Sequence, residues 1–154
     1  MTATNHAVTG ALVATAINRP ILALPAALLS HFVIDGLPHW DYYKFAPTPA
    51  KKRAAATADL SIAGILIIIF ILTVNAPAWL LIFGAGLGVL PDTMWLPFIL
   101  RGTESVRGNP KSPINVIRKY HILIQWAETP KLTGLLAEIA WLFITIFLLY
   151  QVNS

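Results

Sequence analysis

The sequence contains no cysteine, and only 12% of its 154 residues are Asp, Glu, Lys or Arg. The absence of cysteine excludes disulfides, thiolate metal ligands and a cysteine nucleophile. Charged residues at about half the level usual for a soluble domain are too few to cover a surface exposed to water. We therefore exclude a soluble enzyme, a disordered chain and a nucleic-acid-binding domain.

What the chain does contain is apolar. Hydrophobic residues make up 56% of it, and the mean hydropathy is +0.68. This composition predicts an all-α, polytopic membrane helical bundle, with residues 1–154 forming a single membrane domain. The opening MTATNHAVTG lacks a positively charged segment, so no cleavable signal peptide is expected.

Breaks in the apolar segments predict about five membrane helices. The uncharged stretch 60–91 is too long for one crossing of a ~30 Å membrane core, and Asn75-Ala76-Pro77 divides it. Asn18-Arg19-Pro20 divides an earlier segment in the same way. The predicted membrane helices are about 4–18, 20–37, 58–74, 77–91 and 130–152, with a polar loop and a short helix (about 113–128) within 101–128. Because the arms of the first hairpin are short for a span, they either cross a thin membrane or form a re-entrant hairpin.

The positive charges predict an orientation. When five helices alternate, every Lys and Arg except Arg19 falls on the side of the N-terminus. The loop with Lys51, Lys52 and Arg53 belongs to that side. Since basic residues beside membrane helices stay in the cytoplasm, we expect a prokaryotic inner-membrane protein with a cytoplasmic N-terminus.

The two hairpins, about 3–45 and 56–98, resemble each other at an offset of 53 residues. Ala3-Thr4 matches Ala56-Thr57, and Leu37-Pro38 matches Leu90-Pro91. His6 then corresponds to Asp59, and His39 to Asp92. We interpret this as an internal duplication that relates two parallel hairpins by a pseudo-twofold axis, with Thr4 and Thr57 as helix N-caps.

Small residues follow in the second hairpin. Gly84 and Gly88 stand where the first hairpin has His31 and Asp35, and they form a small-xxx-small pattern. Such a pattern favours close packing of helices. A second hypothesis is that these glycines leave room for the His31 and Asp35 side chains.

Ionisable residues gather at one predicted membrane depth. His31 and Asp35 lie on one helical face at i, i+4, and His121, Gln125 and Glu128 share a face of the short helix. Ionisable groups inside a membrane are costly and therefore mark functional sites. Imidazole together with carboxylate suits zinc, with manganese or iron as alternatives. The predicted metal ligands are His6, His31, Asp35, His39, Asp59, Asp92 and His121, and the predicted catalytic bases are Asp41 and Glu128.

Each of these residues also has a structural interpretation. His31 and Asp35 could form a buried hydrogen-bonded pair. Asp92 could cap the turn after Pro91, and Asp59 could be a first-turn helix residue.

Two motifs carry a resemblance to known families. SHFVIDGLPHWD, residues 30–41, resembles the HxxxD-then-His pattern of zinc-dependent phospholipase C-type proteins. GLGVLPDTMW, residues 86–95, resembles the LPD segment of bacterial and archaeal membrane proteins predicted to be metal-dependent hydrolases. The resemblance implies that His31, Asp35, His39 and Asp92 are metal ligands. The chain departs from these families where Gln125 replaces the acid of a later helical HxxxE, and in the order of the two motifs.

The sequence therefore favours a membrane-embedded, metal-dependent hydrolase of a phosphoester, with a phospholipid or lipid-linked substrate, at the cytoplasmic membrane face. The alternatives are a metal or ion transporter and a structural membrane protein whose polar groups serve helix packing. A transporter requires polar residues that continue to the other side, where Asn18, Arg19 and Asn75 offer little. This asymmetry favours a one-sided site.

Overall fold

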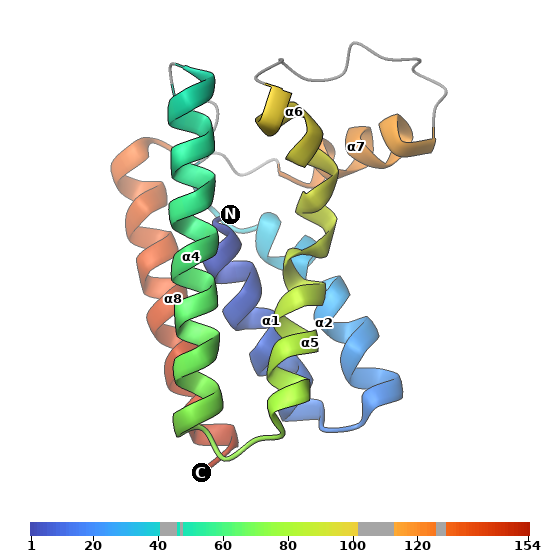
Figure 1. The fold of residues 1–154 in the computed structure, drawn as a ribbon, viewed down its shortest axis with the longest axis vertical. Coiled ribbons are helices and arrows are strands. Elements are labelled where there is room, and N and C mark those ends of the chain that lie inside the picture. The colour runs from blue at the N-terminus through green and yellow to red at the C-terminus, as the bar shows by residue number, and fades with distance from the viewer. Residues whose placement is uncertain (41–45, 47, 102–112, 126–128) are drawn as a thin grey trace.

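A computed structural model describes residues 1–40, 46, 48–101, 113–125 and 129–154, and the regular elements in these ranges are helices. They are α1 (Ala3–Ile17), α2 (Pro20–Asp35), α4 (Pro49–Thr73), α5 (Ala78–Val89), η1 (Leu90–Trp95), α6 (Leu96–Arg101), α7 (Pro113–Ile124) and α8 (Lys131–Val152). Figure 1 shows α1, α2, α4, α5 and α8 side by side in a bundle, with α6 and α7 at one end and the C-terminus at the other. The prediction of an all-α bundle is confirmed.

Three helices are long and apolar enough to cross a membrane: α4, the continuous segment Ala78–Trp95, and α8. Large apolar side chains of α4 and α8 point outward, among them Ile65, Leu72 and Phe143. A helix that is apolar on its outer face as well as its inner face is typical of a lipid surrounding. The chain therefore has the character of a membrane protein. The first hairpin is shorter, since α1 and α2 have 15 and 16 residues, which is about 22–24 Å of helix.

Both predicted hairpin turns are confirmed. Asn18 ends α1 in the left-handed conformation, with φ 48°, and Pro20 occupies the first turn of α2. An Asn tolerates that conformation better than most residues, and Pro needs no N–H partner there. In the second hairpin α4 ends at Thr73 and α5 follows Pro77.

Helix α4 begins earlier than the sequence pattern predicts. It starts at Pro49 rather than near 58, so Lys51, Lys52 and Arg53 lie on its first turns and not in a loop. The Thr48 side chain accepts a hydrogen bond from the Lys51 N–H and caps the helix. Thr57 is therefore an interior residue, and the predicted cap at Thr57 is wrong. The cap of α1 is likewise Thr2 instead of Thr4.

The helix that contains α5 does not end at Pro91. It tightens into η1 and continues as α6 to Arg101. Pro91 and Pro97 each stand at the second residue of a new segment, where a missing N–H costs little. This continuation carries Asp92 and Trp95 on an ordered helical turn.

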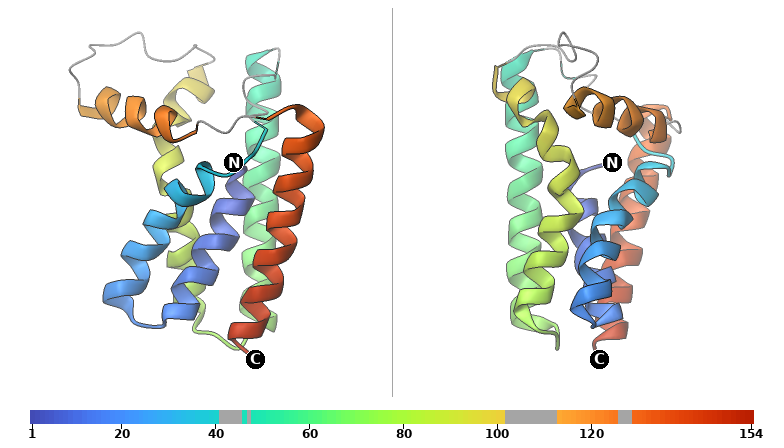
Figure 2. Two further views of the ribbon diagram at one scale, coloured as in Figure 1. Left: turned by 180° about the vertical axis from the view of Figure 1, so that it is seen from behind. Right: turned by 90° about the vertical axis from the view of Figure 1, so that its right-hand side faces the viewer.

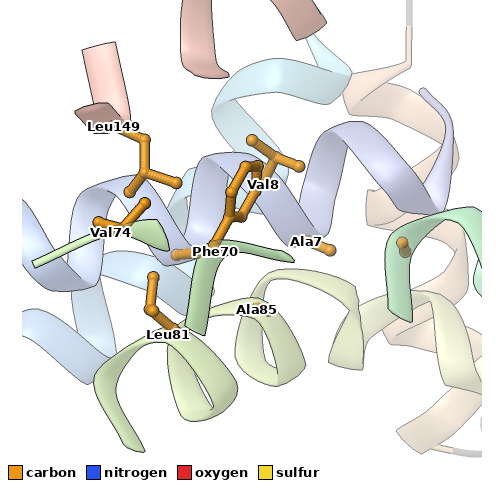
Figure 3. Close-up of a cluster of buried hydrophobic side chains, with 9 residues drawn as sticks. Ala7, Val8, Phe70, Val74, Leu81, Ala85 and Leu149 are labelled. Atoms are coloured by element: carbon orange, nitrogen blue, oxygen red, sulfur yellow. The ribbon is translucent and has the colours of Figure 1, made fainter. Parts of the chain in front are cut away.

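Helix α1 occupies the centre of the bundle and packs against α2, α4, α5 and α8. Its Val8 and Ala11 are fully buried beside Phe70, Leu81 and Leu149, the cluster drawn in Figure 3. Small side chains dominate this interface, so the helices approach closely.

The glycines of α5 face α1. A Cβ added to Gly88 would meet the His6 carbonyl and the Gly10 Cα, and one added to Gly84 would meet Gly10 and Ala14. Close packing is thus the reason for the small residues, and Gly10 is its unforeseen partner on α1. The hypothesis that these glycines make room for His31 and Asp35 stays a prediction.

The helix contacts bear on the proposed duplication. Under a twofold axis, the extensive packing of α1 on α5 requires an equivalent packing of α4 on α2. The contacts between α2 and α4 are far fewer, and the two first arms differ in length, with 15 residues in α1 and 25 in α4. The duplication stays a prediction from the sequence.

Candidate metal centre

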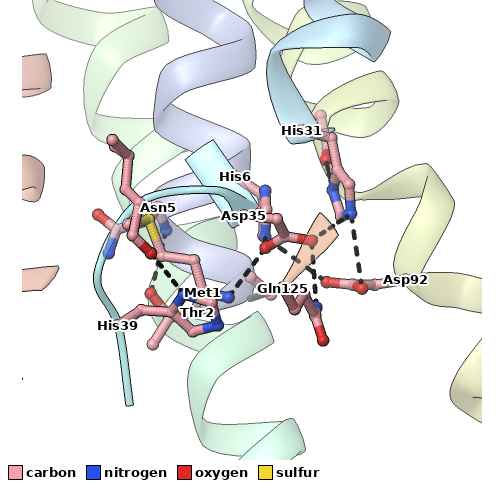
Figure 4. A network of polar contacts seen from close by, with 12 residues as sticks. Met1, Thr2, Asn5, His6, His31, Asp35, His39, Asp92 and Gln125 are labelled. Atoms are coloured by element: carbon pink, nitrogen blue, oxygen red, sulfur yellow. Dashed lines mark hydrogen bonds and ion pairs between the residues drawn. The ribbon is translucent and has the colours of Figure 1, made fainter. Parts of the chain in front are cut away.

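His31, Asp35, Asp92 and His121 come together where three segments of the chain meet. One ligand atom of each lies within 4.8 Å of the others. His31 and Asp35 are one turn apart on α2, Asp92 lies on η1, and His121 lies on α7. Figure 4 shows His31 and Asp92 on one side of Asp35. These four predicted ligands are the residues that the fold brings together.

Asp35 is the centre of the group, and its side chain is completely buried. Its Oδ2 lies 2.7 Å from Nε2 of His121 and 3.2 Å from Nε2 of His31. The Gln125 amide donates to the same oxygen at 3.2 Å. Oδ1 lies 3.0 Å from the amine of Met1. The buried carboxylate is thus surrounded by donors, as an ionised group in an apolar bundle requires.

Asp92 closes the group from the η1 side. Its Oδ1 lies 3.7 Å from Nε2 of His31 and 3.9 Å from Nε2 of His121. These separations are too long for hydrogen bonds, whereas the distances among His31, Asp35 and His121 run from 2.7 to 3.2 Å. Ligands about 2.0–2.1 Å from a tetrahedral zinc ion are separated by about 3.3–3.4 Å. The group therefore has the dimensions of a shell around one ion.

The hydrogen bond at the far side of the His31 ring suits a metal ligand. Its Nδ1 lies 2.7 Å from the Gly88 carbonyl. A carbonyl only accepts, so Nδ1 carries the proton and the Nε2 lone pair points into the group. Metal-binding histidines are typically oriented by such a bond.

His121 has the opposite arrangement. The Trp95 indole N–H donates to its Nδ1 at 3.2 Å. A neutral His121 therefore carries its proton on Nε2 and donates to Asp35. An ion at Nε2 requires that proton to move to Nδ1, which breaks the bond from Trp95. The position of His121 fits a ligand, but its present hydrogen bonding competes with a metal.

His6 adds an unsatisfied imidazole beside the group. It is fully buried and stacks on His31 with ring centroids 3.9 Å apart. Its Nε2 lies 3.1 Å from Asp35 Oδ1, yet neither ring nitrogen makes a hydrogen bond of acceptable geometry. A buried polar atom without a partner costs about 1–3 kcal/mol. An ion or a water molecule at this point would supply the missing interaction, so the described residues fit a metal.

Two predicted ligands have other roles. Asp59 accepts from the backbone N–H groups of Ala3 and Thr4 and from the Thr4 hydroxyl, so it caps α1. His39 is buried, with its Nδ1 bonded to the Leu37 carbonyl, but in Figure 4 it lies apart from the group, beside Met1 and Thr2. Neither belongs to the group of four. The predicted bases Asp41 and Glu128 lie outside the described residues.

Some contributors were not foreseen from the sequence. The Gly88 carbonyl orients His31, and the Trp95 indole donates to His121. The one available signal for Trp95 was its i, i+3 spacing from Asp92 on a helical turn.

Comparison of the chain with protein-family models, curated proteins and solved structures finds no match. The function is therefore argued from the geometry of the site.

Proposed function

We propose that this chain is a membrane-embedded, metal-dependent hydrolase that acts on a phosphoester, lipid-linked and presented at the cytoplasmic face of a prokaryotic inner membrane. The observation that supports it is the convergence of His31, Asp35, Asp92 and His121 within 4.8 Å. Burial of ionisable groups in a membrane bundle is energetically unfavourable, so such groups usually belong to a functional site.

These four residues would hold a divalent ion. Two imidazoles and two carboxylates favour zinc, with manganese or iron as alternatives. When bound, such an ion supplies Lewis-acid chemistry, polarising a phosphoryl oxygen and acidifying water. Asp35 is held in place by its surrounding donors. Asp92 keeps 28% of its side chain exposed and is the member open to a substrate.

His6 is the described residue best placed to move a proton. Its Nε2 lies between Asp35 Oδ1, at 3.1 Å, and Asp92 Oδ2, at 3.8 Å. With no hydrogen bond of its own, it can take up a proton without losing a partner. Asp41 and Glu128 stay candidates from the sequence for the same role.

The orientation is part of the proposal. Lys51, Lys52 and Arg53 lie at the end of α4 that shares the side of the site. Asp59, which contacts the first turn of α1, lies about 9 Å deeper than Arg53 by helical rise. With α1 and α2 also crossing, the bundle has five membrane helices, and the site lies just below the level of these cytoplasmic charges.

The test combines metal analysis with a phosphoesterase assay. Purified protein is expected to contain zinc or manganese and to release phosphate from phosphatidic acid in phosphatidylcholine vesicles. His31→Ala should lose both metal and activity, because it removes a ligand whose orienting hydrogen bond alone is worth about 10–100-fold in affinity. His39→Ala, a buried histidine outside the group, is the matched control and should retain both. Metal-free protein with activity that chelators do not change would contradict the proposal.

A transporter is the second candidate, because polar pairs link α1 and α8 along the bundle. Trp141 donates to Thr9, and Asn153 donates to Thr15 near the far end. These groups bond to one another, and the apolar cluster around Val8 and Leu149 lies among them. Such pairs are typical of helix packing in membranes, so the one-sided site is favoured. Metal uptake into proteoliposomes without hydrolysis would favour the transporter.

A further inference from the structure

Helix α7 is amphipathic, and it turns its polar face to the protein. Asn115, Arg118 and His121 are buried against the bundle. The opposite stripe, Val116, Ile117, Tyr120 and Leu123, is exposed, with Leu123 at 61% and Tyr120 at 62%. A surface helix of a water-soluble protein has the opposite orientation, with its apolar face toward the core.

The bonds between α7 and the bundle are polar. Arg118 donates to the Met94 carbonyl at 2.6 Å and stacks over Trp95, with 5.7 Å from the guanidinium carbon to the ring. His121 and Gln125 bond to Asp35. The helix that supplies His121 is thus tied to the bundle through the candidate site and its neighbours.

The neighbouring helix α2 also exposes large apolar side chains. Helix α7 packs on α2, whose Leu29 and Val33 point outward with 61% and 69% exposed. Figure 2 shows α7 lying crosswise to the upright helices. A tyrosine in the stripe and a lysine, Lys119, at its polar border are typical of a helix lying in the membrane interface.

We propose that α7 is an in-plane membrane helix: its stripe of Val116, Ile117, Tyr120 and Leu123 inserts into the bilayer interface, and this lipid contact holds His121 in the metal centre. The placement of α7 stands on its exposed stripe alone. The coupling to the metal centre rests on the proposed function.

The coupling follows from the energetics of the stripe. Removal of apolar side chains from water is worth about 25 cal/mol per Å², and lipid provides this for the stripe while the protein does not. Without lipid, positions of α7 in which other apolar groups cover the stripe have a lower free energy than the present position. His121 moves with α7, so the metal centre loses one ligand when the interface is lost.

The placement is tested by fluorescence quenching. Because the chain has no cysteine, single cysteines can be introduced and labelled with bimane in the full-length protein. The probe positions are Ile117→Cys and Leu123→Cys, with Lys119→Cys as the matched control on the same helix. Labelled protein is placed in phosphatidylcholine vesicles containing an acyl-chain spin-labelled lipid, without added metal.

We expect the lipid to quench labels at 117 and 123 and aqueous iodide to quench the label at 119. Equal quenching by iodide at all three positions would overturn the placement. Protection of 117 and 123 from both quenchers would also overturn it, since a second copy of the chain would then cover the stripe.

The coupling is tested by zinc binding in the same vesicles. The double variant Ile117→Ser, Leu123→Ser should bind zinc about tenfold more weakly than the wild type, as expected when a ligand loses its support. Ile144→Ser, an equivalent change at a residue of α8 that is 49% exposed, should bind zinc normally.

Wild-type affinity in the double variant would overturn the coupling. A wild-type protein that binds no divalent metal would overturn both the coupling and the proposed function. The quenching result decides the placement of α7 independently of either.

Discussion

At the scale of single residues, the ring nitrogens that would bind an ion lie instead against the carboxylate of Asp35. His121 donates from Nε2 to its Oδ2 at 2.7 Å, and Nε2 of His31 lies 3.2 Å from the same oxygen. One histidine, His31, is oriented so that its Nε2 lone pair is free, and the other, His121, is not. The bond from Trp95 requires Nδ1 of His121 to be unprotonated, whereas an ion at Nε2 would require the proton to be on Nδ1.

Removal of the indole donor should therefore strengthen metal binding. In Trp95→Phe the ring still stacks on His121, but Nδ1 becomes free to carry the proton. A neutral hydrogen bond is worth about 0.5–1.5 kcal/mol, so zinc affinity measured by competition with a chelating dye should rise about two- to tenfold. Most substitutions beside a metal site weaken binding. A loss of affinity in Trp95→Phe would show that the bond from Trp95 supports the ligand.

At the scale of helices, the close packing of α1 on α5 lies beside the site histidines. A Cβ added to Gly88 would meet the His6 carbonyl, and the carbonyl of Gly88 accepts from His31. A substitution at this contact of α1 and α5 therefore alters the helix packing and the position of His31 at the same time.

Gly88→Ala should destabilise the protein. The added Cβ meets backbone, which cannot move aside as a side chain can, and overpacking of this kind costs about 1–3 kcal/mol. Gly86→Ala is the matched control, because nothing lies within 4 Å of its added Cβ. Thermal unfolding in one detergent should show a lower midpoint for Gly88→Ala and no loss for Gly86→Ala. Equal midpoints would mean that α1 and α5 do not cross this closely.

The helices also show what a sequence can and cannot predict. The turns at Asn18 and Asn75 were predictable, because Pro and Asn act locally on the backbone. The start of α4 at Pro49 was not predicted, because the run of lysines and arginine was assigned to a loop. The signals for it are the Thr48 cap, Pro49 in the first turn and good helix formers.

The same division holds for the site. The pairing of His31 and Asp35 follows from helical spacing, and the alternation of helices placed Asp92 and His121 at their level. His39 could not be assigned correctly, because α2 ends at Asp35 and the chain turns away. The spacing of Trp95 from Asp92 places both on one helical face, but the bond from its indole to His121 depends on how α7 packs on the bundle.

At the scale of the whole molecule, the four residues of the candidate metal centre come from α2, η1 and α7, so an ion bound there would add to folding stability. An ion at about 100 times its Kd contributes about 2.7 kcal/mol to the free energy of unfolding. A chain of this size shifts its midpoint by about 2–4 °C per kcal/mol. Zinc-loaded protein should therefore unfold roughly 5–10 °C lower after EDTA treatment.

The measurement is a thermal unfolding scan in nanodiscs with and without EDTA. His31→Ala should show the lower midpoint in both conditions, because it holds no ion to remove. A shift of the same size in His31→Ala would place the stabilising ion elsewhere.

The unequal lengths of the helices have a consequence for the surrounding lipid. Helix α4 carries Lys51, Lys52 and Arg53 on its first turns, whereas α2 has only 16 residues. The apolar wall beside α2 is therefore about 24 Å high, which is shorter than a ~30 Å membrane core. Bilayers accommodate a short apolar wall by thinning next to it. Under the proposed function, phosphate groups of neighbouring lipids would then lie deeper on the α2 side, nearer the level of Asp92. A lipid-linked substrate would reach the site through this thinned part of the leaflet without leaving the membrane.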